Sequence, residues 1–228
     1  MNRDDPRVIE GMRRQSLLRG DEYAETPRLG WKAGFGTEVA MAAIGTTQPL
    51  TGFLTTATLV ESGSGISVDG WGTPLLEPEV AVRIGSELGP GASPEDAVAA
   101  VAAVAAAIEV VDLGEVDRIE EILAGNVFHR KVILGEFQES TLLDDARISV
   151  RVDGSDGPPS DPRDLIGSYG EILSALADQV GLTGERLQPG DVVITGAAVT
   201  PLTLDSGGKF EVSISGGSHV SVKVESGT

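Results

Sequence analysis

The sequence contains no cysteine among its 228 residues. Disulfides, thiolate catalysis and zinc sites built on cysteine are therefore excluded. Aromatic residues are also scarce, at 4%, so a core must be built mainly from alanine, valine, leucine and isoleucine. With 40% hydrophobic and 23% charged residues, the composition is still that of an ordinary globular protein. The length suits one large domain, or a domain with a short arm.

Positive charge is in short supply. The chain has 17 lysines and arginines against 35 acidic residues, which gives a formal net charge of −18. A surface of this sign repels nucleic acid and anionic membranes, so neither is expected as a partner. The charged N-terminus lacks the apolar core of a signal peptide, and the alanine- and valine-rich run 97–111 is too short to span a membrane. We therefore expect a soluble, cytoplasmic protein.

The residue pattern divides the chain into a polar N-terminal stretch and a longer part that is rich in predicted strands. Residues 1–28 predict an N-terminal helical arm, and residues 29–228 carry short apolar runs broken by glycine and proline, which are typical of strands. In 210–224, alternating residues flank a Gly-Gly pair and predict a hairpin. Other patterns predict a strand at 147–154 and helices at 37–45, 93–107 and 167–181, with Ser93 as the N-cap of the second helix.

The stretch 74–85, PLLEPEVAVRIG, predicts a strand that carries two glutamates where apolar residues are expected. Side chains alternate between the faces of a strand, so Glu77 and Glu79 share one face, about 7 Å apart. That face also holds Ala81 and Arg83, while Leu76, Pro78, Val80, Val82 and Ile84 share the other. Buried like charges require a compensating cation or hydrogen-bond donor.

A third acid has the same character, because Glu109 lies between Ala-Ala-Ala-Ile and Val-Val. A buried glutamate is rare unless it is paired. One interpretation is that the three glutamates form salt bridges, for which Lys32 and Arg83 are candidates. The other is a metal site. Three carboxylates without nearby histidine or cysteine suit a hard divalent ion such as Mg²⁺ or Mn²⁺.

An octahedral ion held by three carboxylates keeps three positions for water or substrate. That open side suits a 2-oxo acid, which can chelate through its carboxylate and ketone oxygens. The ion would then stabilise negative charge that develops on an enolate. On this interpretation the residues predict metal-assisted chemistry on a small, oxygen-rich acid.

Several motifs resemble the 2-keto-4-pentenoate hydratase and 4-oxalocrotonate decarboxylase group of the fumarylacetoacetate hydrolase superfamily. The resemblance runs from about Leu29 to the C-terminus. It is carried by GWKAG, IGTTQPLTGFL, LLEPEVAVRIG, AAIEVVD, AGN and PGDVVITG. It implies an α+β fold, a mixed β-roll with peripheral helices, and assembly into homo-oligomers. It also implies that Glu77, Glu79 and Glu109 bind magnesium or manganese.

The resemblance assigns further residues to the site. Lys32 matches a lysine that binds the substrate carboxylate or moves protons, so Lys32→Met is expected to impair substrate binding or turnover with little change in metal affinity. Thr195 and Gly196 match a strand end that binds a carboxylate, with Thr195 also a catalytic candidate. Asn126 and Phe128 correspond to a substrate-binding segment. On these matches, Lys32, Asn126, Phe128, Thr195 and Gly196 are the predicted substrate-binding residues.

The sequence also departs from the family pattern. Thr56 stands where relatives tend to carry an aspartate, and threonine cannot act as a general base near neutral pH. Gly125 replaces an aspartate and Phe128 a small residue, so a narrower, drier pocket and weak hydration are expected. His129 could supply an acid–base group, but a lone histidine beside Arg130 and Lys131 is more often a surface residue, and that interpretation is preferred.

These observations predict a metal-dependent lyase, a hydratase or decarboxylase, that acts on a small 2-oxo or 2-hydroxydienoic acid through a metal-stabilised enolate. One alternative is a relative adapted to tautomerisation, C–C hydrolysis or a biosynthetic tailoring step. Another is a binding protein that keeps the fold without catalysis. Metal-dependent consumption of a 2-hydroxydienoate would select the first, and tight metal binding without turnover would select the last.

Overall fold

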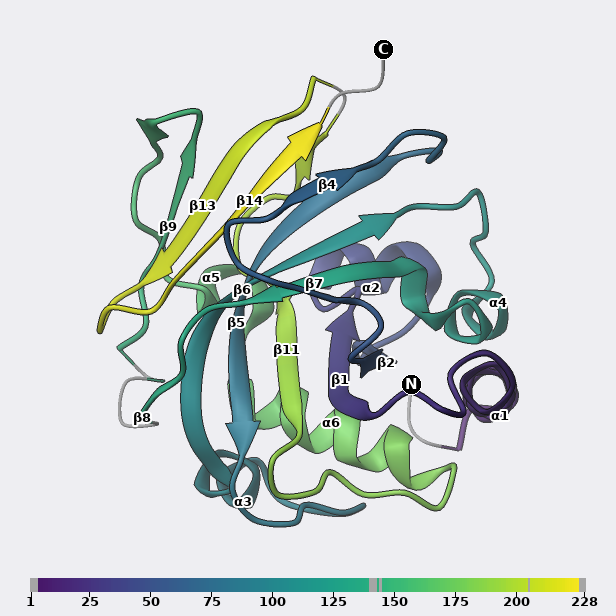
Figure 1. Ribbon diagram of the computed structural model, residues 1–228. Coiled ribbons are helices and arrows are strands. Elements are labelled where there is room, and N and C mark those ends of the chain that lie inside the picture. The colour runs from purple at the N-terminus through teal and green to yellow at the C-terminus, as the bar shows by residue number, and fades with distance from the viewer. Residues whose placement is uncertain (1–3, 140–142, 144, 205, 226–228) are drawn as a thin grey trace.

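The computed structural model describes residues 4–139, 143, 145–204 and 206–225. They form a mixed α+β fold in which a long curled sheet packs against a smaller sheet, with the helices outside (Figure 1). The α+β prediction from the sequence is confirmed.

The large sheet has the strand order β2-β1-β11-β5-β6-β7-β3, with β12 paired to β5 and β8 to β6. β1 and β11 run parallel, whereas β5 is antiparallel to both β11 and β6. The strands are β1 (Arg28–Gly34), β2 (Leu50–Thr55), β3 (Leu59–Val60), β5 (Pro74–Ile84), β6 (Val101–Asp112), β7 (His129–Leu134), β8 (Gln138–Glu139), β11 (Val192–Ala197) and β12 (Leu202–Thr203).

The smaller sheet has the order β10-β9-β13-β14-β4, and its strands β13 and β14 lie against β6 (Figure 1). The predicted Gly-Gly hairpin joins β13 to β14, and Gly216 and Gly217 both have positive φ angles, as a tight turn requires. The strands are β4 (Gly65–Ser67), β9 (Ile148–Val152), β10 (Ser155–Asp156), β13 (Gly208–Ile214) and β14 (His219–Glu225).

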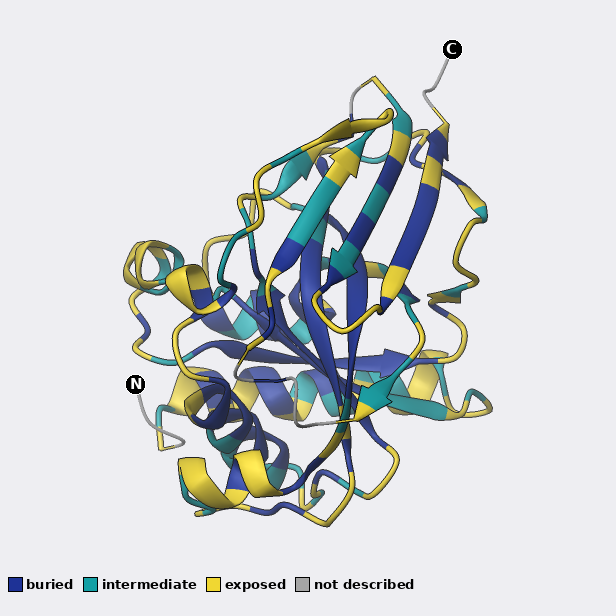
Figure 2. Cartoon of the chain, turned by 90° about the vertical axis from the view of Figure 1, so that its left-hand side faces the viewer, coloured by how far each residue is buried: buried dark blue, intermediate teal, exposed yellow. Residues whose placement is uncertain are grey.

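Helices surround the sheets, and Figure 2 shows that the strands at the centre of the molecule are largely buried. Apolar side chains form this core. α6 carries the predicted inward residues Ile172, Leu173, Leu176 and Val180, and all four are buried. The helices are α1 (Pro6–Glu22), α2 (Glu38–Ile44), α3 (Pro94–Ala99), α4 (Ile119–Ala124), α5 (Arg163–Ile166) and α6 (Tyr169–Gly181), with a 3-10 turn η1 (Asn126–Phe128).

One predicted helix is largely wrong. The stretch 93–107 was expected to be helical throughout, but α3 ends at Ala99 and strand β6 begins at Val101. The predicted start is right, because Ser93 caps α3 in a capping box with Asp96. Beyond it, the strand lies between β5 and β7, and every residue from Val104 to Val111 is buried. A continuous apolar run is typical of a central strand, so burial on both faces overrides the helix propensity of alanine.

The edge strand β2 is protected by buried side-chain amides. Gln15 donates to the carbonyl of Thr51, and the amide oxygen of Gln179 accepts from the Thr51 N–H. Asn126 accepts from the Phe53 N–H at 2.7 Å and donates to the Phe53 carbonyl at 3.0 Å. Backbone groups at a sheet edge need such partners when water is excluded. These amides therefore fix β2 beside the strand that carries Lys32.

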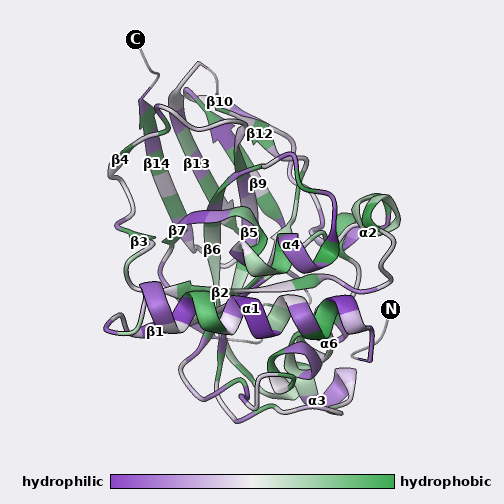
Figure 3. Ribbon diagram, turned by 90° about the vertical axis from the view of Figure 1, so that its right-hand side faces the viewer, coloured by the Kyte–Doolittle hydropathy of each residue, from purple (hydrophilic) through white to green (hydrophobic). Residues whose placement is uncertain are grey.

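The N-terminal helix α1 lies against α4 at one side of the large sheet (Figures 1 and 3). Its residues Val8 and Met12 are buried in a small cluster with Leu50 and Leu123. Figure 3 shows hydrophilic and hydrophobic segments alternating along α1. Whether residues 1–28 act as a separate arm stays a prediction. No helix in the part of the chain that the structure describes is long and apolar enough to cross a membrane.

Candidate metal centre

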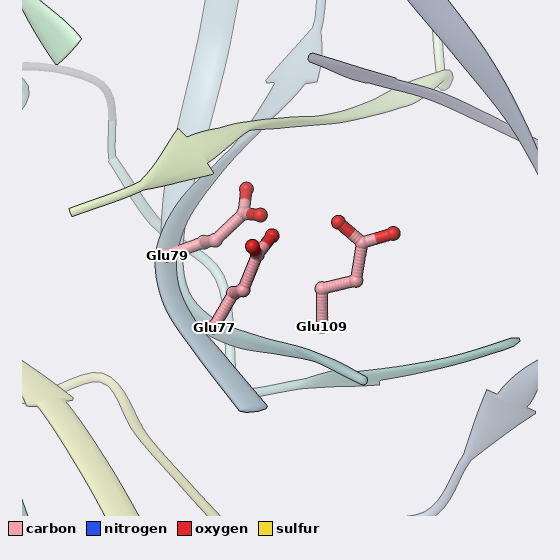
Figure 4. Close-up of side chains that lie close together, drawn as sticks. All are labelled: Glu77, Glu79 and Glu109. Atoms are coloured by element: carbon pink, nitrogen blue, oxygen red, sulfur yellow. The ribbon is translucent and has the colours of Figure 1, made fainter. Parts of the chain in front are cut away.

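Three glutamate side chains converge at the centre of the large sheet (Figure 4). Glu77 and Glu79 lie on the same face of β5, and Glu77 is directly paired with Glu109 of β6. One carboxylate oxygen from each residue lies within 4.8 Å of the other two. The predicted alternation of β5 is confirmed, because Leu76, Val80, Val82 and Ile84 pack into the main core on its opposite face.

Two of these carboxylates have oxygens without hydrogen-bond partners. Glu79 and Glu109 are fully buried, and Glu79 Oε1 and Glu109 Oε2 accept no hydrogen bond from the described residues. The other oxygen of Glu79 accepts from the Gly196 N–H at 2.7 Å. Orphaned oxygens inside a protein are costly and mark a missing ligand or ion. An oxygen-seeking divalent cation fits this donor set.

Within the glutamate cluster, Glu109 is the residue that contacts a basic side chain. The Lys32 ammonium lies 2.6 Å from Glu109 Oε1 and donates to the Val127 carbonyl at 3.0 Å, and both side chains of the pair are buried. Among the described residues, neither Glu77 nor Glu79 forms an ion pair with a lysine or arginine. Arg83, the other candidate, is exposed and lies over the ring of Phe137. The salt-bridge interpretation therefore holds for Glu109 alone.

The charges in the cluster do not balance when all three glutamates are ionised. Three carboxylates and one ammonium leave two negative charges within a small buried volume. Burial lowers the pKa of His129, with partial opposition from Glu109, so this imidazole does not supply a full positive charge near neutral pH. One divalent cation would neutralise the set.

His129 is buried rather than exposed, so the interpretation of it as a surface residue was wrong. Its Nδ1 lies 2.6 Å from Glu109 Oε1, and its Nε2 lies 2.9 Å from the Thr58 hydroxyl. A shift in the pairing of β6 with β7 sets Val110 against Lys131 but Val111 against His129. The extra residue turns His129 onto the face of Glu109. Such a histidine orients a carboxylate as an outer partner of a metal ligand.

The pKa values of the glutamates diverge in the metal-free state. Burial and then Glu109 raise the pKa of Glu77 to about 7, with Lys32 in opposition. Burial, Glu109 and Glu77 raise the pKa of Glu79 well above its usual range. Burial also acts to raise the pKa of Glu109, but the Lys32 charge and the His129 hydrogen bond outweigh it and hold that pKa below the usual range. Glu109 is therefore the carboxylate of the three that is ionised before a cation binds.

We expect the metal-free protein to lose stability as pH rises. Glu77, with its pKa raised to about 7, and Glu79, with its pKa raised well above its usual range, hold protons in the folded state at pH values where the unfolded chain has released them. The two groups contribute fully to the free energy of unfolding at pH values below their pKa in the unfolded chain. This contribution is lost as pH rises through their pKa in the folded protein. A divalent cation competes with these protons, so the rise in Tm that it causes should grow between about pH 5 and 8. Thermal unfolding with magnesium or with EDTA measures both trends, and a magnesium effect that does not vary with pH would contradict this account.

The residues predicted at the strand end have partners of their own. The Thr195 hydroxyl donates to the Val80 carbonyl at 2.9 Å, and the Gly196 N–H donates to Glu79. Both groups therefore act within the protein, where Gly196 orients a candidate ligand. Their direct contact with a substrate carboxylate stays a prediction.

Two other predicted positions lie differently from the expectation. Thr56 is exposed in the turn after β2, and it lines neither the cavity beside Glu77 nor the cavity beside Phe128. The idea that it replaces an acid within the site is therefore not supported. Phe128 is half-buried, faces Phe35 with ring centres 6.2 Å apart, and lines a cavity of about 630 Å³ that does not include Glu77. The expectation of weak hydration loses its structural basis.

Asn126 is a structural residue in addition to a wall of that cavity. Its amide makes two hydrogen bonds with the Phe53 backbone, and the turn it opens places the Val127 carbonyl against Lys32. Asn126 itself has a φ of 56°, a conformation that asparagine tolerates better than alanine. Asn126→Ala should therefore reduce the free energy of unfolding by about 2–4 kcal/mol in urea titrations. A reduction within about 0.5 kcal/mol, as for a surface substitution, would contradict this role.

The family model described as fumarylacetoacetate (FAA) hydrolase C-terminal matches residues 31–227. The chain belongs to this family. The resemblance drawn from the motifs is thereby confirmed. Similar curated proteins are a 4-oxalocrotonate decarboxylase of a Pseudomonas species, 28% identical over 205 residues, and a 2-hydroxyhexa-2,4-dienoate hydratase of Comamonas testosteroni, 26% identical over 209 residues. Each alignment covers 88% of this chain, with 80% of the first relative and 79% of the second.

Solved structures share the fold of this member of the FAA hydrolase family. A 4-oxalocrotonate decarboxylase from Pseudomonas putida G7, complexed with magnesium and adipate, superposes with a TM-score of 0.82 at 22% identity, covering 92% of this chain and 82% of the other. A fumarylpyruvate hydrolase from Pseudomonas aeruginosa, in complex with Mn²⁺ and pyruvate, gives a TM-score of 0.68 at 24% identity, covering 88% and 90%. The β-roll of this family is confirmed as the fold.

The sequence analysis singled out the three acids and Lys32, but it did not predict the contact of His129 with Glu109 or that of Thr58 with His129. Thr58 and His129 are separated by more than seventy positions, and a bulge in β7 decides which way His129 points. Two flanking basic residues, Arg130 and Lys131, suggested an exposed segment. The only hint lay in the apolar run Val132-Ile133-Leu134, which forms the second half of strand β7.

Proposed function

We propose that this protein is a metal-dependent lyase that acts on a small 2-oxo or 2-hydroxydienoic acid. The observation that carries the proposal is the set of carboxylate oxygens of Glu79 and Glu109 that lack hydrogen-bond partners beside Glu77, with two uncompensated negative charges when all three are ionised. Glu77, Glu79 and Glu109 would hold one Mg²⁺ or Mn²⁺. When bound, the ion supplies Lewis-acid polarisation of the oxygens of the 2-oxo acid.

The chain's own residues prepare the site for such a substrate. The Gly196 N–H orients Glu79, and His129 with Lys32 orients Glu109, so these two carboxylates are positioned before anything binds. An ammonium has three N–H donors, and Lys32 uses two of them on Glu109 and Val127. The third donor can bind a substrate carboxylate or pass a proton to a substrate carbon.

The relatives support a lyase over the other chemistries considered. One is named as a decarboxylase and one as a hydratase, and both are matched over most of their length. Both reactions draw electron density from a carbon skeleton toward the oxygens at one end of the substrate. A shared electron-withdrawing site of this kind accounts for both with one arrangement of carboxylates and lysine.

The test is turnover with and without the ion. Purified protein is stripped with EDTA, reloaded with magnesium or manganese, and supplied with 2-hydroxyhexa-2,4-dienoate or 4-oxalocrotonate, with loss of the conjugated absorbance as the signal. We expect metal-dependent turnover of at least one, at rates of about 1–1,000 per second. Tight metal binding with no turnover of either acid would contradict the proposal and favour a binding protein.

A further inference from the structure

One cavity opens directly onto the candidate metal centre. It has a volume of about 450 Å³ and includes Glu77 in its wall, together with the backbone that follows Lys32 in β1 and Gly196 in β11. Its side walls come from α2, α5 and the segment after β11. The large side chains in the wall are Phe35, Val39, Leu165, Ile166, Val199 and Pro201. All six are apolar, so the cavity extends from the metal centre along an apolar wall that reaches solvent at Val39 and Leu165.

The wall provides no positive charge. Among the described residues that line this cavity, Glu77 is the one ionisable side chain, and the polar ones are Thr37 and Thr200. Arg163, the arginine next to the wall in sequence, is bound through two nitrogens to Asp161 at 3.0 and 2.9 Å. The adjacent charges at Glu38 and Asp164 are negative. A carboxylate placed in this cavity would lie beside acidic and apolar side chains, with no cation to compensate its charge.

We propose that this cavity selects a 2-oxo acid with an uncharged, apolar tail and rejects one that ends in a second carboxylate. The inference rests on the proposed function, in which the 2-oxo acid end lies at Glu77, Glu79 and Glu109. An apolar tail gains from leaving water, whereas a carboxylate loses its hydration without a compensating cation. The expected preference for the apolar tail is roughly 10–100-fold in affinity.

A preference for an apolar tail also limits which reaction the substrate can undergo. The substrates in the names of the two relatives have six carbons, and in their dienol forms one ends in a methyl group and the other in a carboxylate. Selection of the methyl-ended type leaves no tail carboxylate to be lost as carbon dioxide. Hydration remains available, because the H and OH of one water add across a carbon–carbon double bond and nothing is released. No oxidant or further reactant is required.

A matched pair of unreactive ligands tests the selection. 2-Oxohexanoate and 2-oxoadipate have the same chain length and the same chelating end, and differ in a terminal methyl group or carboxylate. Calorimetry with the magnesium-loaded protein should give tighter binding of 2-oxohexanoate by roughly 10–100-fold. Equal affinities, or tighter binding of 2-oxoadipate, would overturn the inference. Failure of both acids to bind in a magnesium-dependent way would instead overturn the proposed function, and the inference with it.

Variants at the rim place the tail in this cavity. Val39 is 81% exposed and Thr200 is exposed, so neither substitution disturbs the core. Val39→Lys and Thr200→Lys should each bind 2-oxoadipate about tenfold more tightly than the matched glutamine variants do. Val39→Gln and Thr200→Gln control for size and polarity and should keep the original preference. Lysine variants that behave like the glutamine variants with both ligands would overturn the assignment of the tail to this cavity.

Discussion

Glu79→Gln is expected to stabilise the metal-free protein and to remove its response to magnesium. Glu79 is fully buried beside Glu77 and Glu109, so the metal-free chain must bind a proton at Glu79 when it folds, and glutamine removes that requirement. The remaining amide oxygen can still accept from the Gly196 N–H. With the carboxylate gone, magnesium affinity should fall by at least about 100-fold, or 2.8 kcal/mol, and turnover with it.

Thermal unfolding with EDTA and with magnesium reads both effects in one experiment. In EDTA, the variant should unfold at a higher temperature than the native chain. The unfolding temperature of the variant itself should be the same in EDTA and in magnesium. Glu61→Gln provides a matched control, because Glu61 is exposed and lies outside the cluster. A Glu79→Gln protein that is destabilised in EDTA, or that still gains stability from magnesium, would contradict the role given to this carboxylate.

Lys32→Met is expected to destabilise the metal-free protein by about 3–5 kcal/mol, because it leaves the buried Glu109 without its ammonium partner. Methionine keeps most of the volume of the side chain, so the effect is electrostatic. Magnesium should recover more stability in this variant than in the native chain, since the cluster then carries an additional uncompensated charge. Turnover should fall by about 100- to 10,000-fold even with the ion bound.

This expectation corrects the one drawn from the sequence, in which metal affinity stayed close to unchanged. The Lys32 ammonium lies 2.6 Å from Glu109, so a change at Lys32 also changes the charge of the carboxylate cluster. Metal affinity therefore cannot be independent of Lys32. Lys223→Met serves as the control, because Lys223 is exposed on β14 in the smaller sheet. Full activity in Lys32→Met, or a loss of stability no larger than that of the control, would exclude this role.

Local patterns in the sequence predicted the parts of the site that depend on one strand. Alternation along β5 is a property of the strand itself, so the shared face of Glu77 and Glu79 followed directly from the spacing. The isolation of Glu109 in an apolar run also predicted its burial correctly. Carboxylates without compensation in such surroundings are informative because their burial is unfavourable unless a ligand is present.

Features that depend on pairing between strands could not be predicted in this way. The fate of 101–107 was decided by its position between β5 and β7, which outweighed the helix propensity of alanine. The direction of His129 depends on a one-residue shift against β6. The two hydrogen bonds between the Asn126 amide and the edge of β2 were not predicted, and its contact with a substrate stays a prediction. Each outcome rests on partners distant in the sequence.

The most direct test of the central claim is diffraction from crystals grown with magnesium and oxalate. The account predicts a single ion bound by one oxygen each from Glu77, Glu79 and Glu109 at about 2.1 Å, with oxalate on its open side. Glu79 Oε1 and Glu109 Oε2, the oxygens without partners, should turn toward that ion. Carboxylates that keep only Lys32, His129 and the Gly196 N–H as partners, with no ion between them, would contradict it.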